Sequence, residues 1–203
     1  FAAAAVQATT TSANIVGYAK VTANKGALTF TAINFDTGSE TYAGLYDALP
    51  NNSTLYVWDK DNNQYVSANK GFFGWSGAAA TRTVANGDAL WISIPDSATE
   101  ASYDIIYPGE VNVAATNTVT LDAIDAVGLG YPVEVTFGST DLYANAPNDT
   151  TLYLWNGSAY TPYNKGFFGW SSGAETAVIG PTTAFWVNVP SSFSWEESRP
   201  FNY

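Results

Sequence analysis

The ionisable side chains that could carry acid–base or nucleophilic chemistry are few in this sequence. The chain of 203 residues has no histidine and no cysteine, so it lacks the usual general base near neutral pH and the thiolate nucleophile. Its 18 Asp and Glu residues could supply the two carboxylates that glycoside hydrolysis needs. None of them stands at a spacing that singles it out. We therefore expect a protein that is not an enzyme and has no catalytic residues.

Two charged motifs suggest other chemistry, and a simpler interpretation is favoured for each. Asp59, Asp61 and Asn63 alternate as at the start of a calcium loop, but the central glycine and distal glutamate of that pattern are missing. A hairpin turn is the better prediction, and we expect no metal and no cofactor. Lys70 and Lys165 occupy equivalent positions in a repeat. A buried lysine beside a carboxylate could form an isopeptide crosslink, but we favour a solvated lysine that flanks a turn.

The aromatic residues predict a binding surface rather than a catalytic one. The motif Asn-Lys-Gly-Phe-Phe-Gly-Trp-Ser occurs twice, at 69–76 and 164–171. Its rings could form a platform that stacks on sugars or inserts into a partner. The platform residues would be Phe73, Trp75, Trp91, Phe168, Trp170 and Trp186. The alternative, which we favour, is a loop tucked over the sheet so that Phe72, Trp75 and Trp91 form a satellite cluster in each copy.

The elements that must position these residues recur along the chain. Four segments of the first half return in the second half with the same order and nearly the same spacing. The matched segments are 45–50 with 142–147, 55–58 with 152–155, 69–76 with 164–171 and 89–95 with 184–190. The separation between matched segments has the length of a small domain and is too long for a solenoid unit. We interpret it as an internal duplication.

Both halves contain strand patterns, and helix signals are almost absent. Short runs rich in Thr, Val and aromatic residues alternate with Gly, Pro, Asn and Asp. In the segment 90–94 the aliphatic residues share one face and Trp91 lies on the other, so each repeat has an aliphatic face and an aromatic face. The predicted strands are 14–22, 27–35, 54–58, 64–67, 89–94, 103–107, 111–115, 118–123, 132–137, 151–155, 159–163 and 183–189.

These patterns predict an all-β protein made of two tandem related β-sandwich-like domains. The expected divisions are an apolar N-terminal arm at 1–12, β domains at 13–98 and 99–192, and an aromatic C-terminal tail at 193–203. The seam between the domains is placed at 96–100.

Composition limits the partners of the protein. Charged residues make up 12% of the chain, the net charge is −11, and the seven basic residues are scattered singly, so nucleic acid is not expected as a partner. No apolar run is long enough to span a bilayer as a helix. The small residues of 1–8 resemble a signal-peptide cleavage region, which predicts an extracellular or cell-surface protein. Four asparagines open glycosylation sequons, namely Asn51, Asn52, Asn148 and Asn156.

The two ends of the chain are apolar and could join subunits. An extended peptide can add as a strand to a sheet edge of another molecule, and small alternating side chains suit a narrow groove. The candidate interface residues are Phe1, Ala2, Ala4, Val6, Phe201 and Tyr203. Head-to-tail contacts of this kind do not close and so generate filaments.

One stretch of the sequence resembles a family of exported bacterial proteins. The stretch is Asn-Ile-Val-Gly-Tyr-Ala-Lys-Val at 14–21, followed by Leu-Tyr-Val-Trp at 55–58 and a Gly-Trp turn. Those proteins open the mature chain with an Asn-Ile/Val-Val-Gly-Tyr motif and carry a Trp-containing hairpin before a Gly-rich strand. The resemblance covers roughly residues 13–95 and implies export and a β fold, but no activity. The sequence departs from the family at 87–91, where Gly-Asp-Ala-Leu-Trp replaces a frequent Gly-Glu-Gly-Phe-Phe.

Taken together, these features predict a structural subunit of an extracellular filament or surface layer that assembles with copies of itself. The alternative is a carbohydrate-binding module that uses the aromatic platform to bind glycans.

Overall fold

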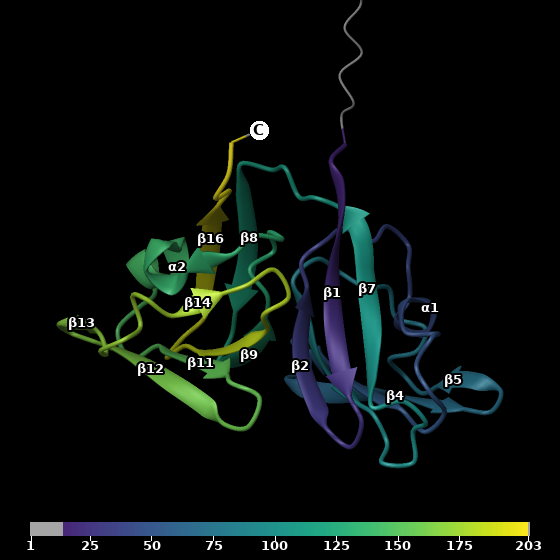
Figure 1. Ribbon diagram of the computed structural model, residues 1–203. Helices are drawn as coiled ribbons and strands as arrows, with labels where there is room; N and C mark the ends of the chain where they lie inside the picture. The colour runs from purple at the N-terminus through teal and green to yellow at the C-terminus, as the bar shows by residue number, and fades with distance from the viewer. Residues whose placement is uncertain (1–13, 203) are drawn as a thin grey trace, which may run out of the picture.

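The computed structural model describes residues 14–202 and consists almost entirely of β-strands (Figure 1). This confirms the predicted all-β fold class. Of the candidate interface residues, Phe1, Ala2, Ala4, Val6 and Tyr203 lie outside the described residues. Within the described part, no helix has the length and apolar character to cross a membrane.

The strands form two lobes that follow one another along the chain. The first lobe contains β1 (Val16–Asn24), β2 (Leu28–Ile33), α1 (Tyr42–Leu45), β3 (Thr54–Asp59), β4 (Gln64–Gly71), β5 (Gly74–Ser76), β6 (Asp88–Ser93) and β7 (Ser102–Glu110). The second lobe contains β8 (Thr116–Leu121), β9 (Ile124–Val127), β10 (Val135–Thr136), the 3-10 helix η1 (Phe137–Ser139), α2 (Asp141–Asn145), β11 (Thr151–Trp155), β12 (Tyr160–Gly166), β13 (Gly169–Trp170), β14 (Val178–Ile179), β15 (Phe185–Asn188) and β16 (Phe193–Ser198).

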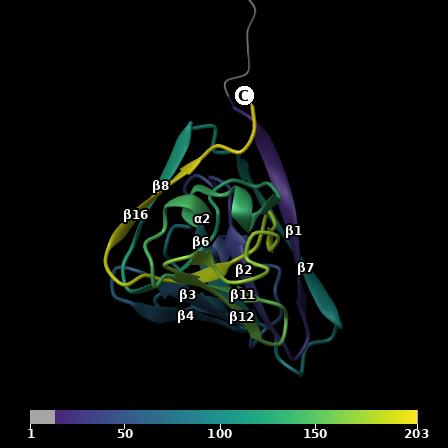
Figure 2. The ribbon, with the colours of Figure 1, turned by 90° about the vertical axis from the view of Figure 1, so that its left-hand side faces the viewer.

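One ten-stranded sheet runs through both lobes. Its order is β13-β12-β11-β15-β9-β6-β3-β4-β5, with β2 also paired to β6. A two-stranded antiparallel ribbon covers the sheet in each lobe, β1–β7 in the first and β8–β16 in the second. The two ribbons lie on opposite sides of the molecule (Figure 2).

Each lobe has its own core between its ribbon and its part of the sheet. In the first lobe, Ile105 and Tyr107 of the ribbon join Leu90 and Ile92 of the sheet in one buried cluster. The second lobe packs Leu121 and Trp195 of its ribbon with Leu152, Phe185 and Val187 of the sheet. The predicted alternation is therefore confirmed in β6, where the aliphatic residues face the core and Trp91 faces away.

Two segments pair differently from the sequence-based divisions. β7 pairs with β1 along its whole length, from Val16↔Glu110 to Asn24↔Ser102, so the changeover between the lobes follows Glu110. The segment 111–115, predicted as a strand, is the connection between the lobes. The tail from Phe193 forms β16, which pairs with β8 and buries Trp195 in the second core. The pairings of β7 with β1 and of β16 with β8 join residues that are far apart in the sequence, and local patterns do not encode such pairings.

Candidate functional site

The aromatic faces of the two repeat copies meet each other between the lobes. Trp91 stacks on Phe30 with 4.6 Å between ring centroids and makes an edge contact with Trp155 of the second lobe at 5.1 Å. In the mirrored arrangement, Trp186 contacts Trp58 of the first lobe at 4.7 Å. Each of the two indole N–H groups donates to a tyrosine hydroxyl at 2.9 Å, Trp91 to Tyr65 and Trp186 to Tyr160. Trp91 and Trp186 are thus engaged inside the molecule.

The lobes are also joined by polar contacts around this cluster. The Trp58 indole donates to Asp125 Oδ1 at 3.1 Å. The buried Asn34 side chain donates to the Pro181 carbonyl at 2.9 Å and accepts from the Gly130 amide at 3.1 Å. These bonds satisfy polar groups that burial would otherwise leave unpaired. The two copies of the repeat therefore form one packed unit.

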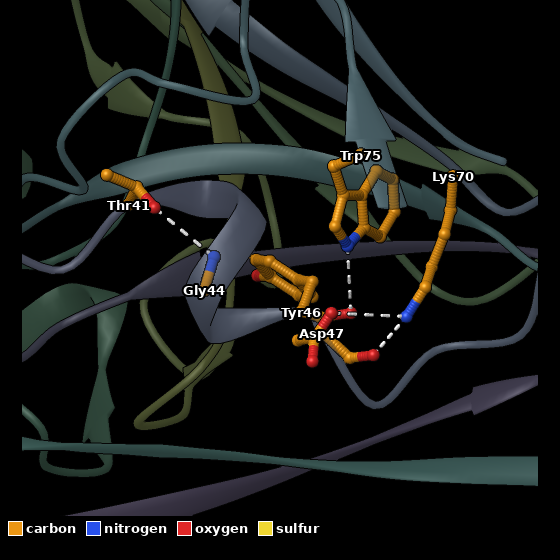
Figure 3. A network of polar contacts seen from close by, with 6 residues as sticks. All are labelled: Thr41, Gly44, Tyr46, Asp47, Lys70 and Trp75. Atoms are coloured by element: carbon orange, nitrogen blue, oxygen red, sulfur yellow. Dashed lines mark hydrogen bonds and ion pairs between the residues drawn. The ribbon is translucent and has the colours of Figure 1, made fainter. Parts of the chain in front are cut away.

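Trp75 and Trp170 have a different role, at the ends of the two short helices. The Trp75 indole donates to the Tyr46 carbonyl at 3.3 Å, at the end of α1 (Figure 3). The Trp170 indole donates to the Tyr143 carbonyl at 2.7 Å in α2. The last carbonyls of a helix have no partner within the helix, so these side chains supply the missing donors.

Lys70 and Lys165 strengthen the same helix ends. Lys70 lies over the Trp75 ring, and its ammonium group donates to the Asp47 carbonyl and lies 3.5 Å from Asp47 Oδ1 (Figure 3). Lys165 donates to the Tyr143 and Ala144 carbonyls, both at 3.1 Å, and partial burial lowers the pKa of its ammonium group. The prediction of a solvated lysine is wrong, since the Lys70 side chain is only 12% exposed. A cation at a helix C-terminus is favourable.

The helix starts are built alike. Thr41 Oγ1 accepts from the Gly44 amide at 3.2 Å in α1 (Figure 3), and Thr140 Oγ1 accepts from the Tyr143 amide at 3.1 Å in α2. Threonine is a favoured N-cap residue because its hydroxyl satisfies one of the unpaired amides of the first turn. The two threonines are not equivalent in the repeat, because Thr41 lies four residues before Leu45 and Thr140 lies two residues before the matching Leu142. Equivalent residues of the repeat therefore make equivalent contacts only at the C-terminal ends of the helices.

The Phe-Phe pairs are the exposed part of the repeated motif. Phe72 and Phe73 form the two-residue turn between β4 and β5, and their side chains are 85% and 99% exposed. Phe167 and Phe168 occupy the same place between β12 and β13 with the same exposures. The prediction that Phe72 packs in a satellite cluster is therefore wrong, because the turn leaves its ring in solvent. The two hairpins project at opposite ends of the molecule (Figure 1).

The predicted platform thus falls into three separate places. Trp91 and Trp186 lie between the lobes, Trp75 and Trp170 cap helices, and only the tips carry freely exposed rings. Of the six predicted platform residues, Phe73 and Phe168 are the two that lie at the tips. Strand parity alone would not separate these groups, because it shows which face a ring is on and not what covers that face.

The segment that resembled a calcium loop forms a hairpin turn between β3 and β4. Asp59 accepts from the Asn62 side-chain amide at 3.1 Å and forms an ion pair with Arg82 at 3.2 Å. Hydrogen bonding from Asn62 and the positive charge of the Arg82 guanidinium lower the pKa of the Asp59 carboxyl. Asn63 closes the turn with φ of 51°. Residues 14–202 contain no cluster of three acidic, histidine or cysteine side chains arranged to hold a metal.

The outward face of the β1–β7 ribbon is a surface that the sequence analysis did not identify. At the start of β1 it carries four exposed apolar residues, which we call the outer patch: Val16, Tyr18, Ile106 and Pro108. Val16 and Tyr18 are 74% and 75% exposed. An open groove of about 770 Å³ lies over this patch. It is lined by Val16, Gly17, Tyr18, Asp36, Thr37, Gly38, Ile106, Pro108, Gly109 and Glu110.

The sequence did contain a signal for this patch. Residues 15–19 are Ile, Val, Gly, Tyr and Ala, so a strand there must present apolar side chains on both of its faces. Val21 points inward and is buried, which leaves Val16 and Tyr18 on the outward face. A strand that is apolar on both faces predicts a cover on each side.

The second ribbon provides the comparison. The outward residues of β8 and β16 are polar and exposed: Thr116, Thr118, Thr120, Ser194, Glu196 and Ser198. Within residues 14–202, β1 pairs only with β7, and β8 only with β16, so each ribbon has an open main-chain edge. Within residues 14–202, only the first ribbon combines an open edge with an apolar patch on its outward face.

The remaining predicted residues have simpler places. Phe201 is half-buried in its own lobe, with its ring at 6.0 Å from the Tyr131 ring and beneath the Arg199 guanidinium. The sequon asparagines Asn51, Asn52, Asn148 and Asn156 are exposed. No protein-family model, no curated protein and no solved structure matches this chain.

Proposed function

We propose that this chain is a structural subunit of an extracellular filament or surface layer and that it assembles with copies of itself. The observation that carries the proposal is the difference between the two ribbons. The β1–β7 ribbon has an open edge and the outer patch, whereas the β8–β16 ribbon presents threonines, serines and a glutamate. Exposed apolar clusters on proteins are typical of interaction sites. Because only one ribbon carries it, the contact joins unlike surfaces and can propagate.

The main-chain part of this contact would be strand addition by the N-terminal arm. Residues 1–8 of one copy would lie along the open edge of β1 in the next copy. Eight extended residues span at most about 26–29 Å, which is close to the length of the nine-residue β1. The small side chains Ala2, Ala4 and Val6 would pass over the ribbon without steric conflict. The extracellular location remains a prediction from the sequence.

The experiment is to measure the native mass of the full chain by light scattering and to image it by negative stain. We expect polymers that A2D/A4D/V6D disperses, since three carboxylates cannot be buried without partners. The matched control is A3S/A5S, which changes the intervening arm positions and should preserve assembly. A native protein that stays at 21.6 kDa at all concentrations would contradict the proposal.

Glycan binding is a second candidate, supported by the 99% exposure of Phe73 and Phe168. A sugar needs a free ring face, and these two rings have one. The tips lack adjacent polar side chains of the kind that orient a sugar, so the geometry favours self-assembly. Retardation in polysaccharide gels, lost in F73S/F168S, would support this candidate. Equal mobility of wild type and variant in every gel would exclude it.

A further inference from the structure

We infer that the Gly-Phe-Phe-Gly hairpin tips are docking elements that insert into the groove over the outer patch of a second copy of this chain. This inference rests on the proposed self-assembly and names the side-chain part of the contact. It assigns a donor surface and an acceptor surface on each subunit.

The tips are held out in a fixed shape that the core of their own lobe does not require. In each hairpin the flanking glycines pair with each other, Gly71 with Gly74 and Gly166 with Gly169. The next residues inward are the lysine and tryptophan that fasten the hairpin to a helix end. The two rings of each tip lie 5.2 Å apart, edge to face. A preorganised apolar projection loses little entropy on docking.

The groove over the outer patch has the size and chemistry for such a tip. Its volume of about 770 Å³ is within the roughly 300–1,000 Å³ of pockets that enclose small ligands. Its lining combines the apolar residues Tyr18, Ile106 and Pro108 with the exposed acidic residues Asp36 and Glu110. A group that binds in this groove must therefore be apolar and must not carry a negative charge.

Charge identifies the tips as the part of a second copy that fits. The chain has a net charge of −11, so most of its surface would be repelled by Asp36 and Glu110 in the lining of the groove. The Gly-Phe-Phe-Gly turn carries no charge, and the lysine before it, Lys70 or Lys165, is held at a helix end of its own lobe. The tip therefore presents an uncharged apolar surface, which matches the apolar residues of the groove and is not repelled by its acidic ones.

The contact area shows that tip docking acts together with the arm. Two phenylalanines bury roughly 300–500 Å², about half of the roughly 800 Å² that each partner of a stable interface contributes. Each copy offers two tips at opposite ends of the molecule (Figure 1) and, over its outer patch, the groove described above. Because each groove takes one tip, a linear chain of subunits uses one tip of each copy, and the other tip is left without an acceptor groove.

The first test uses the absence of native cysteine, which makes engineered thiols specific reporters. Single variants F73C or F168C are mixed with I106C under mild oxidation and analysed on non-reducing gels. We expect a disulfide-linked dimer between tip and groove for at least one tip. The matched control replaces I106C by T118C, an exposed position on the outward face of the polar β8–β16 ribbon, and should give no excess over random collision. Equal yields with both acceptors would overturn the inference.

The second test measures the critical concentration of assembly by light scattering for F72S/F73S, F167S/F168S and the combined variant. We expect the combined variant to require about tenfold more protein or higher, with an unchanged unfolding temperature because the replaced rings are exposed. If the wild type never assembles, the proposed function fails. If the wild type assembles and the combined variant assembles equally well, only the tip inference fails.

Discussion

At the scale of single residues, the repeated Lys and Trp act through the helices rather than on a ligand. Trp170 and Lys165 both donate to the Tyr143 carbonyl, at 2.7 Å and 3.1 Å. In the first lobe the Trp75 bond to Tyr46 is longer, at 3.3 Å. In both lobes the lysine and the tryptophan donate hydrogen bonds to carbonyl groups at the end of a helix.

A direct prediction concerns the indole donors. Trp170→Phe should lower the free energy of unfolding by about 1 kcal/mol, the net value of one hydrogen bond, plus the loss of ring contacts. Trp75→Phe should cost less because its N–H···O distance is longer. Chemical denaturation followed by far-UV circular dichroism measures both. An equal or larger effect of Trp75→Phe would contradict the role assigned to the N–H group.

Glu197 is a buried carboxyl with a structural task. Its Oε2 accepts from the Trp195 indole at 2.8 Å and from the Asp141 amide at 2.9 Å, at the start of α2. Burial raises the pKa of the Glu197 carboxyl above its ordinary value, against the opposing effect of these hydrogen bonds. The folded state therefore binds this proton more tightly than the unfolded state does.

The pH dependence follows from that direction. The stability contributed by the raised pKa of Glu197 is fully present below the pKa that a glutamate has in the unfolded chain, about 4.3. This stability is lost as the pH rises through the pKa of Glu197 in the folded protein. The unfolding free energy of wild type relative to Glu197→Gln should therefore increase as pH falls from 7 to 4. Glu196→Gln, an exposed neighbour on β16, is the control. A difference that is flat or falls towards pH 4 would refute the assignment.

At the scale of elements, the two Gly-Phe-Phe-Gly hairpins depend on one backbone conformation. Gly74 and Gly169 both have φ of +105°, which side-chain-bearing residues rarely adopt. A Cβ at either position would meet no atom within 4 Å, so a substitution acts through the backbone alone. The glycine that follows the Phe-Phe pair is thus what sets the tip shape.

Gly169→Ala should destabilise the β12–β13 hairpin by about 1 kcal/mol or more because of this backbone strain. Amide hydrogen exchange should become faster around Lys165 and Trp170, with little change in the first lobe. The control is Gly166→Ala in the same hairpin, because Gly166 does not have a positive φ, whereas Gly157 does, at 98°. A similar effect of both substitutions would show that backbone conformation is not the cause.

At the scale of the whole molecule, the two lobes share one sheet and one aromatic cluster. The sheet connects them at Asp88↔Val127, and the rings of Trp58, Trp91, Trp155 and Trp186 fill the space between them. Small paired units bury limited cores of their own. We therefore expect the lobes to unfold in one cooperative transition.

Trp186→Ala tests this coupling, since it removes the ring that contacts Trp58 and Phe30 across the lobes. The loss should be about 3 kcal/mol, at the lower end for a large core truncation because the ring is only partly buried. Differential scanning calorimetry should then resolve two transitions. The exposed Phe168→Ala should leave a single transition near the wild-type temperature. Two transitions already in the wild type would contradict the coupling.

The sequence by itself determined the fold class, because strand alternation and turn residues are local properties. The parity of Leu90, Trp91 and Ile92 correctly separated a core face from an aromatic face. The repeat also indicated that both copies would treat equivalent residues alike, as Lys70 and Lys165 do.

Only the tertiary structure decided what covers each face. Trp91 packs against the other lobe, and Val16 pairs with Glu110, which lies at the other end of the first lobe's sequence. Phe73 and Tyr18 are left in solvent. Parity fixes the direction of a side chain relative to its own strand, but its neighbours come from strands distant in the chain. Those neighbours are selected by the packing of the whole molecule, which is why only the folded chain shows that the outer patch and the tips stay uncovered.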